Sequence, residues 1–318
     1  MCIAVWAWRS HDEYELVLLL NRDEYHERPT EAVSWWGDGE KRILGGRDRV
    51  AGGTWLCCSK NGRLAFLTNF REPDVCPNLK SRGDLPVRFL EALRLRVYVI
   101  QVDGASGERA ITNDSTKSPL EFSEEIAKEA DQYNGFNLII ADLCLKVMAY
   151  VSNGPKGKPT IVQLVTPGLH VLSNANLDTP WCKAQRLVQN FKKLLMKQEG
   201  DVPLKEMAEK LMQDTTRVDQ DQLPNTGCGL EKESLLSSIF IDIDNDQVST
   251  STTKSFAFSH SSKTSANHCS QGRYGTRSTT AFCVRENTVT LFERYLESGL
   301  WKEHTFQYQI ESMCQKEG

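Results

Sequence analysis

The stretch that decides the fold is residues 2–24, CIAVWAWRSHDEYELVLLLNRDE, near the start of the chain. It contains one apolar run at 2–8 and another at 15–20, separated by a polar segment. Two apolar runs around a polar turn predict an antiparallel hairpin with buried strands. A turn centred between His11 and Asp12 pairs residues whose numbers sum to about 23, so we expect Cys2 to lie across from Asn21.

Further hairpins are expected along the chain. The runs 54–59 and 63–69 flank Lys60-Asn61-Gly62, and Asn-Gly between apolar runs is the strongest short-range hairpin signal. The other expected strand pairs are 136–141 with 147–152, 161–165 with 169–173, and 279–284 with 288–294, followed by a last strand at 304–310.

Three helices are expected between these strands. Ser118-Pro119 supplies a cap followed by proline at the first helical position, which opens a helix to about residue 131. Thr179-Pro180 does the same for a helix with apolar residues at helical spacing, and a further apolar stripe covers 204–212. Strands, then helices, then strands predict an α+β fold built on antiparallel sheets.

The composition excludes several classes of protein. The chain has 318 residues, 40% of them hydrophobic and 25% charged, and a formal net charge of -4. Without an overall basic charge, we expect no nucleic-acid binding by bulk electrostatics, and no apolar run reaches the length of a transmembrane segment. Charged residues follow the first apolar run at once, which argues against a secretory signal and favours a cytoplasmic location.

The cysteine pattern predicts neither a metal site nor a disulfide framework. Ten cysteines are spread along the chain, and none belongs to a C-x-x-C pair. Structural zinc sites use such pairs, and disulfides are rare without a secretory route. We therefore expect most of these cysteines to be small buried side chains.

Two segments do not fit the pattern of strands and helices. Residues 92–114 mix arginines with a β-like run, and residues 249–266 are rich in serine and threonine. Both have the character of long surface loops. We expect a single domain over 1–318 with loop insertions at 92–114 and 247–271.

Cys2 is a candidate nucleophile. Removal of Met1 would expose an α-amine with a pKa of about 7.7–8, which could act as the base for the thiol of the same residue. In the predicted hairpin, Asp23 could orient that amine and Arg22 could lower the pKa of the thiol. The alternative is an incidental cysteine beside a solvated turn at 21–24.

Other polar residues stand at the ends of predicted strands. Asn69 ends the strand that lies opposite Thr54, Asn174 ends another, and Arg277 opens the last hairpin. Side-chain amides at such ends could donate hydrogen bonds to an oxyanion. Asparagine also ends strands because it tolerates turn dihedrals, so the pattern alone does not bring these residues together.

The motif Asn21-Arg22-Asp23-Glu24 resembles the signature of the NRDE family, the transport and Golgi organisation family. Further matching motifs, in order, are ERP at 27–29, WWG at 35–37, GGTWL at 52–56, LTN at 67–69, YNGFNL at 133–138, LSNA at 172–175, TPW at 179–181 and YGTR at 274–277. The family is similar in turn to the N-terminal-nucleophile (Ntn) hydrolases of the penicillin V acylase and bile salt hydrolase group. That similarity implies a four-layer αββα sandwich of antiparallel sheets.

The resemblance also implies roles for individual residues. It gives Cys2 the place of the nucleophile and Asp23 the place of the residue that holds the α-amine. Asn69 and Asn174 match polar groups of the oxyanion site, and Arg277 matches the active-site arginine. The residues expected to bind ligand beside these five are Asn21, Arg22, Glu24, Thr54 and Trp55.

The first functional hypothesis follows from the family. Its members are implicated in Golgi organisation and secretion, in movement of haem and in acyl-lipid homeostasis. The resemblance therefore implies a cytoplasmic trafficking factor, associated with Golgi or mitochondria, that holds a small amphipathic ligand, haem or an acyl lipid. Haem has one local feature in its favour, Cys76-Pro77, because a cysteine thiolate can ligate haem iron. The alternative is a loop cysteine before a turn proline.

Two other hypotheses compete with it. One is an N-terminal-cysteine amidohydrolase or acyltransferase that acts on an amide or thioester, and the other is a scaffold with a vestigial pocket. The hydrolases carry an arginine near the end of the second strand. Leu20 occupies the nearest equivalent position here and Arg22 is the only substitute, which favours the carrier over the enzyme.

Overall fold

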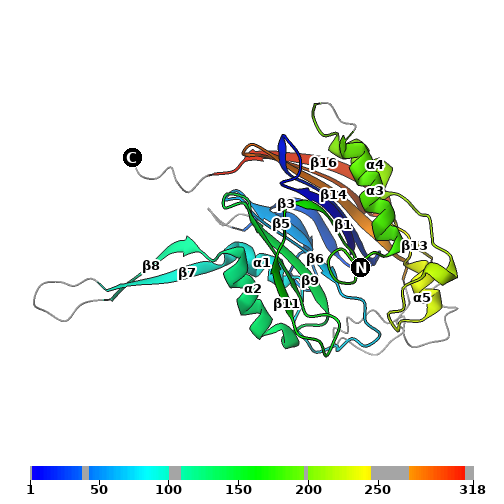
Figure 1. Cartoon of the computed structure of the whole chain (residues 1–318), viewed down its shortest axis with the longest axis horizontal. Coiled ribbons are helices and arrows are strands. Elements are labelled where there is room, and N and C mark those ends of the chain that lie inside the picture. The colour runs from blue at the N-terminus through cyan, green and yellow to red at the C-terminus, as the bar shows by residue number, and fades with distance from the viewer. Residues whose placement is uncertain (1, 38–42, 100–108, 197–199, 245–271, 312–318) are drawn as a thin grey trace, which may run out of the picture.

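The strands form two seven-stranded antiparallel sheets (Figure 1). This computed structural model describes residues 2–37, 43–99, 109–196, 200–244 and 272–311, and their side chains except at 93–99 and 109–116. The first sheet runs β12 (Gly168–Leu172), β1 (Cys2–Trp8), β2 (Tyr14–Tyr25), β14 (Tyr274–Arg285), β15 (Thr288–Glu297) and β16 (Leu300–Gln309), with β13 (Asp242–Ile243) beside β14. The second runs β11 (Ile161–Leu164), β10 (Val147–Ser152), β9 (Phe136–Asp142), β6 (Arg63–Asn69), β5 (Leu56–Ser59), β4 (Ile43–Asp48) and β3 (Thr30–Trp36).

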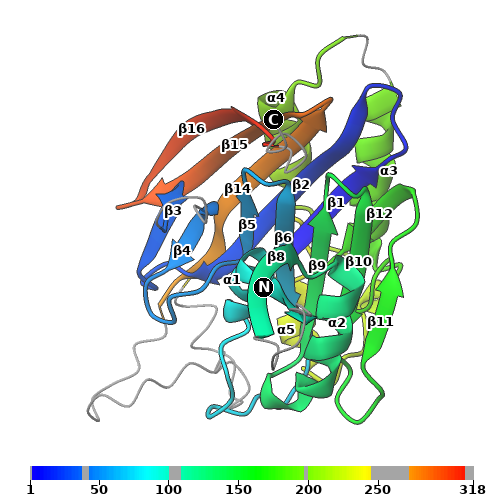
Figure 2. The same cartoon turned by 90° about the vertical axis from the view of Figure 1, so that its left-hand side faces the viewer.

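Helices cover the outer face of each sheet. Helices α3 (Cys182–Met196) and α4 (Leu204–Met212) pack on the first sheet, and α1 (Asp84–Glu91) and α2 (Pro119–Lys128) pack on the second. In Figure 2, α2 lies over β9 and β10. A third apolar core lies between the sheets, where Trp6 meets Phe66 at 5.2 Å between ring centroids. The expected four-layer αββα sandwich is confirmed.

Shorter elements complete the fold. Helix α5 (Leu230–Leu235) packs beside β13 through Leu236, Ile241 and Tyr274. Two short 3-10 helices lie at Ala130–Gln132 and Gln220–Gln222. None of the helices in the described ranges has the length and apolar composition needed to cross a membrane.

Helix α2 starts at its sequence signal, whereas α3 begins at Cys182 and not at Pro180. The hydroxyl of Ser118 accepts a hydrogen bond from the Glu121 N–H, and the Glu121 carboxylate accepts one from the Ser118 N–H, so a capping box opens α2. Pro119 is the first helical residue, as expected. The stripe at 204–212 coincides with α4, whereas α1, α5, β3, β4 and β13 were not expected from the sequence.

One expected strand pair does not form. Strand β11 pairs with β10 in the second sheet, and β12 pairs with β1 in the first, so the segments 161–165 and 169–173 belong to different sheets. Pro167 lies between them and has no N–H to donate to a ladder. The chain therefore crosses from one sheet to the other at this proline instead of folding back as a hairpin.

The first hairpin forms with a register one residue away from the expected one. The closing hydrogen bond runs from the Arg9 N–H to the Glu15 carbonyl at 2.8 Å, and Cys2 pairs with Arg22, not with Asn21. Side chains alternate between the faces of a sheet, and directly paired residues share a face. Arg22 therefore lies on the face of Cys2, and Asn21 lies on the opposite face.

The segment at 92–114 contains a hairpin. Strands β7 (Leu93–Val99) and β8 (Arg109–Thr116) pair only with each other and extend away from the sandwich (Figure 1). The expected open loop is therefore a two-stranded ribbon. The second expected insertion, 247–271, lies outside the described residues.

Candidate functional site

Cys2 lies at the bottom of a small pocket at one end of the sandwich. The pocket is enclosed by the start of β1, the end of β2, the segment before β5 and the segment before α1. We call it the Cys2 cup, and define it by Cys2, Arg22, Asp23, Trp55, Asn69 and Arg82. Its volume is about 80 Å³, which accommodates a few water molecules or one small functional group.

The Cys2 thiol is almost covered. Its residue is 8% exposed. Burial raises the pKa of the thiol, and the nearby Asp23 carboxylate raises it further, while the Arg22 charge lowers it. A thiol in this state needs a base before it can act as a nucleophile. Five of the eight described cysteines are buried, as expected, and none of the eight is paired in a disulfide among the described residues.

Arg22 supplies a fixed positive charge inside the cup. Its residue is 4% exposed, its guanidinium carbon lies 4.3 Å from the Trp55 ring centroid, and its Nη2 lies 3.6 Å from the Asp48 carboxylate. Leu20 is buried in the core between the sheets. The cup therefore contains an arginine although position 20 is leucine.

Asp23 lies beside Cys2, and a hydrogen bond fixes its side chain. Its Oδ1 accepts a hydrogen bond from the Thr276 hydroxyl at 2.7 Å, and its residue is 3% exposed. Burial raises the pKa of Asp23, although the buried Lys183 ammonium and the Thr276 hydrogen bond oppose this shift. An acid with a raised pKa beside a thiol is a candidate for proton exchange with that thiol.

Asn21 takes no part in the cup. Its Nδ2 donates to the carbonyls of Met212 and Ile239 at 2.8 and 3.1 Å, and its Oδ1 accepts from the Thr279 hydroxyl at 2.6 Å. These partners lie on the helical side of the first sheet. The register of the hairpin explains the difference from the expected ligand-binding role, because residue 21 faces away from Cys2.

The other residues expected to bind ligand do line the cup. They are Glu24, Thr54 and Trp55. Burial acts to raise the pKa of Glu24, but the Arg22 charge and other nearby groups outweigh it, so the net shift is downward. Thr54 donates its hydroxyl proton to the Leu56 carbonyl at 2.9 Å and so belongs to the wall.

Asn69 and Asn174, each at the end of a strand, are joined by a hydrogen bond from the side chain of one to the backbone of the other. Asn69 lines the cup, and its carbonyl accepts a hydrogen bond from Asn174 Nδ2 at 2.8 Å. Asn174 is 1% exposed and does not line the cup itself. Its expected place in an oxyanion site is therefore behind Asn69, where it positions the end of β6.

Arg277 lies behind the cup. Its Nη1 donates to the carbonyls of Tyr25 and Arg28 and to the Thr30 hydroxyl. Burial lowers the pKa of Arg277 to about 10, and repulsion from Arg22 adds to the shift. In this structure it shapes the loop after β2 and does not line the cup.

Arg82 is a cup residue that the sequence did not single out. Its Nη1 donates to the Gly135 carbonyl at 3.0 Å, and burial lowers its pKa to about 10. The wall beside it needs glycine, because a Cβ on Gly53 would lie 2.4 Å from the carbonyl carbon of Gly83. The sequence indicated this wall only through the pair of glycines at 52–53 before a predicted strand.

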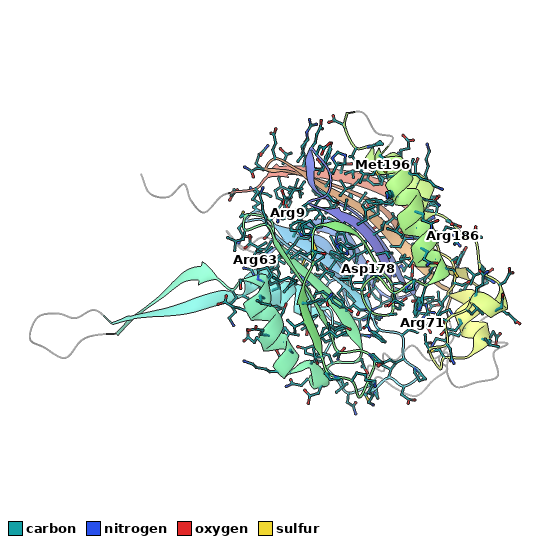
Figure 3. All side chains as sticks on the ribbon, viewed as in Figure 1. Arg9, Arg63, Arg71, Asp178, Arg186 and Met196 are labelled. Atoms are coloured by element: carbon teal, nitrogen blue, oxygen red, sulfur yellow. The ribbon has the colours of Figure 1, made fainter. Side chains whose placement is uncertain are left out.

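A wider cavity adjoins the cup on the far side of Asn69. Its volume is about 620 Å³, within the range of about 300–1,000 Å³ typical of small-molecule sites. We call it the Arg71 cleft, and define it by Phe70, Arg71, Pro73, Asn174, Trp181 and Pro224. Arg71 lies at the side of the molecule opposite the β7–β8 ribbon (Figure 3).

The described residues contain no group of three or more metal-ligating side chains. Cys76 is exposed, and its backbone N–H and carbonyl are both hydrogen-bonded to the Asn134 amide at 2.8 Å. It lines a third cavity of about 400 Å³, next to the Arg71 cleft.

Comparison with known proteins places the chain in a family. The model of the family described as Transport and Golgi organisation 2 matches residues 1–298. The chain belongs to the Transport and Golgi organisation 2 family. The Transport and Golgi organization 2 homolog of Mus musculus is 29% identical over 98% of this chain and 100% of its own length. The Homo sapiens homolog of this family is 36% identical over 58% of this chain and 60% of its own length.

Solved structures similar to this member of the Transport and Golgi organisation 2 family include two hydrolases. A mutant of conjugated bile acid hydrolase from Clostridium perfringens has a TM-score of 0.35 at 10% identity, over 98% of this chain and 97% of its own. An ortholog of N-acylethanolamine-hydrolyzing acid amidase from Caenorhabditis elegans has a TM-score of 0.33 at 10% identity, over 71% and 95%.

Proposed function

We propose that this member of the Transport and Golgi organisation 2 family acts in Golgi organisation and secretion by binding a small amphipathic ligand, haem or an acyl lipid. The observation that carries the proposal is the Arg71 cleft, about 620 Å³ in volume and lined by Phe70, Pro73 and Trp181. The Cys2 cup, at about 80 Å³, is too small for the body of such a ligand. In this proposal the cleft holds the body, and the protein works in the cytoplasm in association with Golgi or mitochondria.

Ligand capture by the purified chain tests this function. Small molecules that copurify with the wild type are identified by mass spectrometry, and added haem is followed by its absorption. Ala175→Trp should fill the cleft, because Ala175 lines it, and should remove the ligand. Val50→Trp, at a residue that is 48% exposed, is the matched control. The proposal fails if no haem or acyl lipid binds to the wild type, or if Ala175→Trp retains it.

A second candidate function is an N-terminal-cysteine amidohydrolase or acyltransferase. The observation that favours it is the meeting of Cys2, Arg22 and Asp23 in one cup, with Asn69 at its wall. Once Met1 is removed, the α-amine takes the thiol proton and sulfur attacks the carbonyl carbon of an amide or thioester. The leaving amine or thiol receives the proton, and water or an acceptor amine releases the acyl group from sulfur.

Cys2→Ser separates the two functions. A hydroxyl keeps the shape of the thiol but is a much weaker acid, so turnover of an amide or thioester should fall by roughly a hundredfold or more. Ligand binding in the cleft should change by less than about twofold. A burst of product from the wild type that is absent in Cys2→Ser would establish the enzyme. Equal turnover by both proteins would exclude it.

A further inference from the structure

Arg71 is a buried cation at the inner wall of the cleft. Its residue is 5% exposed, and its guanidinium carbon lies 4.8 Å from the centroid of the Trp181 ring. One terminal nitrogen is paired with Glu233, and the other donates weakly to Asn174 Oδ1 at 3.5 Å. Its Nε has no hydrogen-bond partner among the described residues. A buried guanidinium with an unused donor is costly unless a ligand completes it.

The charge around Arg71 is not balanced by Glu233 alone. That carboxylate also accepts a hydrogen bond from the Thr226 hydroxyl. The buried Lys183 ammonium donates at 2.8 Å to a neutral group, the Leu236 carbonyl. Burial lowers the pKa of Lys183 to about 7, and repulsion from Arg71 adds to this shift. The carboxylates of Asp23 and Glu233 oppose this shift, and an anion on the Arg71 side would weaken the repulsion further.

The remainder of the cleft separates polar and apolar surface. Phe70, Pro73, Trp181 and Pro224 supply apolar walls. The acidic side chains that line the cleft, Glu72 and Asp74, belong to its outer part, where Glu72 accepts a hydrogen bond from the Lys156 N–H and both residues are exposed or partly exposed. Lys156, which is exposed, lines the same part of the cleft, so the outer charges are mixed. The buried cation is Arg71, and an anion is attracted to that end of the cleft.

We infer that the Arg71 cleft binds an organic anion, a carboxylate or phosphate monoester with an apolar body, whose charged group lies against Arg71 and whose body lies along Phe70 and Trp181. The inference rests on the proposed function and specifies the ligand class. The anionic group is attracted to the guanidinium charge, and the Trp181 ring, whose centroid lies 4.8 Å from the guanidinium carbon, holds that group in place. An uncharged ligand with the same body satisfies only the apolar walls.

Calorimetric titration with three probes of equal chain length tests the inference. The probes are dodecanoate, dodecyl phosphate and dodecanol, each below the concentration at which it aggregates. One or both anions should bind to the wild type about tenfold more tightly than the alcohol, the difference expected for one charge-assisted hydrogen bond. The two anions together distinguish a carboxylate site from a phosphate site.

Two sets of variants identify the group that recognises the charge. Arg71→Met with Glu233→Gln removes both partners of the buried pair, which is better tolerated than removal of one, and should abolish the preference for anions. Ala175→Asp and Ala175→Asn differ only in charge, and the aspartate should weaken anion binding about tenfold relative to the asparagine, without an effect on dodecanol. Arg294→Met is the matched control, because Arg294 stacks on Trp301 at 4.6 Å, away from the cleft.

The outcomes separate this inference from the proposed function. If dodecanol binds as tightly as the anions, or if the preference survives in the double variant, the anion site is refuted while ligand binding stands. If none of the probes binds but haem or a copurified acyl lipid does, the anion site is refuted and the proposed function stands; if nothing binds in either experiment, both proposals fail. If the double variant does not unfold cooperatively, the Ala175 pair decides alone, and equal anion binding by its two members refutes the site.

Discussion

The register of the first hairpin decides that Arg22 lies beside Cys2. They share a face of the first sheet because the hairpin closes between Arg9 and Glu15. A shift of the register by one residue would bring Asn21 into the cup and turn Arg22 toward the helices. The charge beside the thiol is therefore a consequence of the turn geometry.

The thiols should differ in their rates of alkylation. Cys76 and Cys144 are exposed, whereas Cys57 and Cys58 are fully buried, and burial raises the pKa of Cys58 to about 12. At about pH 8 we expect iodoacetamide to modify the exposed pair first, then Cys2, and the buried pair only on unfolding. Peptide mass spectrometry over time measures the order. Modification of Cys2 as fast as Cys76 would contradict the enclosed cup.

His170 should make stability depend on pH. Burial acts to lower its pKa, but hydrogen bonds to Asp178 and to the Thr166 carbonyl, each at 2.8 Å, outweigh it and the net shift is upward. A group whose pKa is raised by folding stabilises the protein below its unfolded pKa of about 6.5, and this contribution is lost as the pH rises through the folded value.

The test compares wild type with His170→Gln in urea at about pH 5.5 and about pH 8.5. The difference between their free energies of unfolding should be larger at the lower pH. Asp178→Asn should reduce the same dependence, because Asp178 is the charged partner of the ring. A difference that does not change with pH would exclude this role for His170.

At the scale of elements, one buried carboxylate links the two sheets by a hydrogen bond. Glu293 on β15 is fully buried, and its Oε2 accepts hydrogen bonds from the Val33 N–H of β3 at 2.8 Å and from His304 Nε2 at 2.9 Å. The bond to Val33 links the first sheet to the second where β3 departs from regular pairing with β4. A buried group that loses its partner costs about 1–3 kcal/mol.

Glu293→Ala should therefore lower the free energy of unfolding by about 2 kcal/mol or more, since it leaves the Val33 N–H unsatisfied. Glu297→Ala, on the same strand and paired with Lys302 at the surface, should change it by less than about 1 kcal/mol. Denaturant titration gives both values. Equal effects of the two substitutions would show that the buried Glu293 carboxylate contributes no more to stability than a surface ion pair.

At the scale of the molecule, we expect the sandwich to fold without the β7–β8 ribbon. The ribbon pairs with no other strand among the described residues, and the Lys117 N–H donates to the Ala92 carbonyl at 3.3 Å across its base. Replacement of residues 93–116 by a short glycine linker should leave the thermal midpoint unchanged or raise it. Loss of cooperative unfolding in the shortened chain would show that the ribbon belongs to the fold.

The site was predictable where local sequence sets the position of a side chain. Arg22, Asp23 and Glu24 lie near the end of β2, so their approach to Cys2 follows once the first hairpin is placed. Asn69 ends β6 in the second sheet and reaches the cup only through the packing of the two sheets. Asn174 and Arg277 are near, but each is committed to backbone groups. Their contacts depend on the conformation of loops, which the local sequence does not predict.

The sequence by itself determined most of the helices and strands. Asn61-Gly62 marked a hairpin, Ser118-Pro119 marked the start of α2, and the apolar runs marked most strands. These signals act over a few residues, so each can be recognised without the remainder of the chain. The family motifs then implied the layered arrangement.

Only the tertiary structure decided the register, the partners of β11 and β12, and the meeting of Arg71 with Trp181 and Glu233. All seven residues of β1 are buried. The strand therefore has no alternation of polar and apolar residues from which its two faces could be assigned. Residues 71 and 233 meet through the packing of separate layers. Long-range pairing depends on how every layer packs against the next, and no local pattern encodes that.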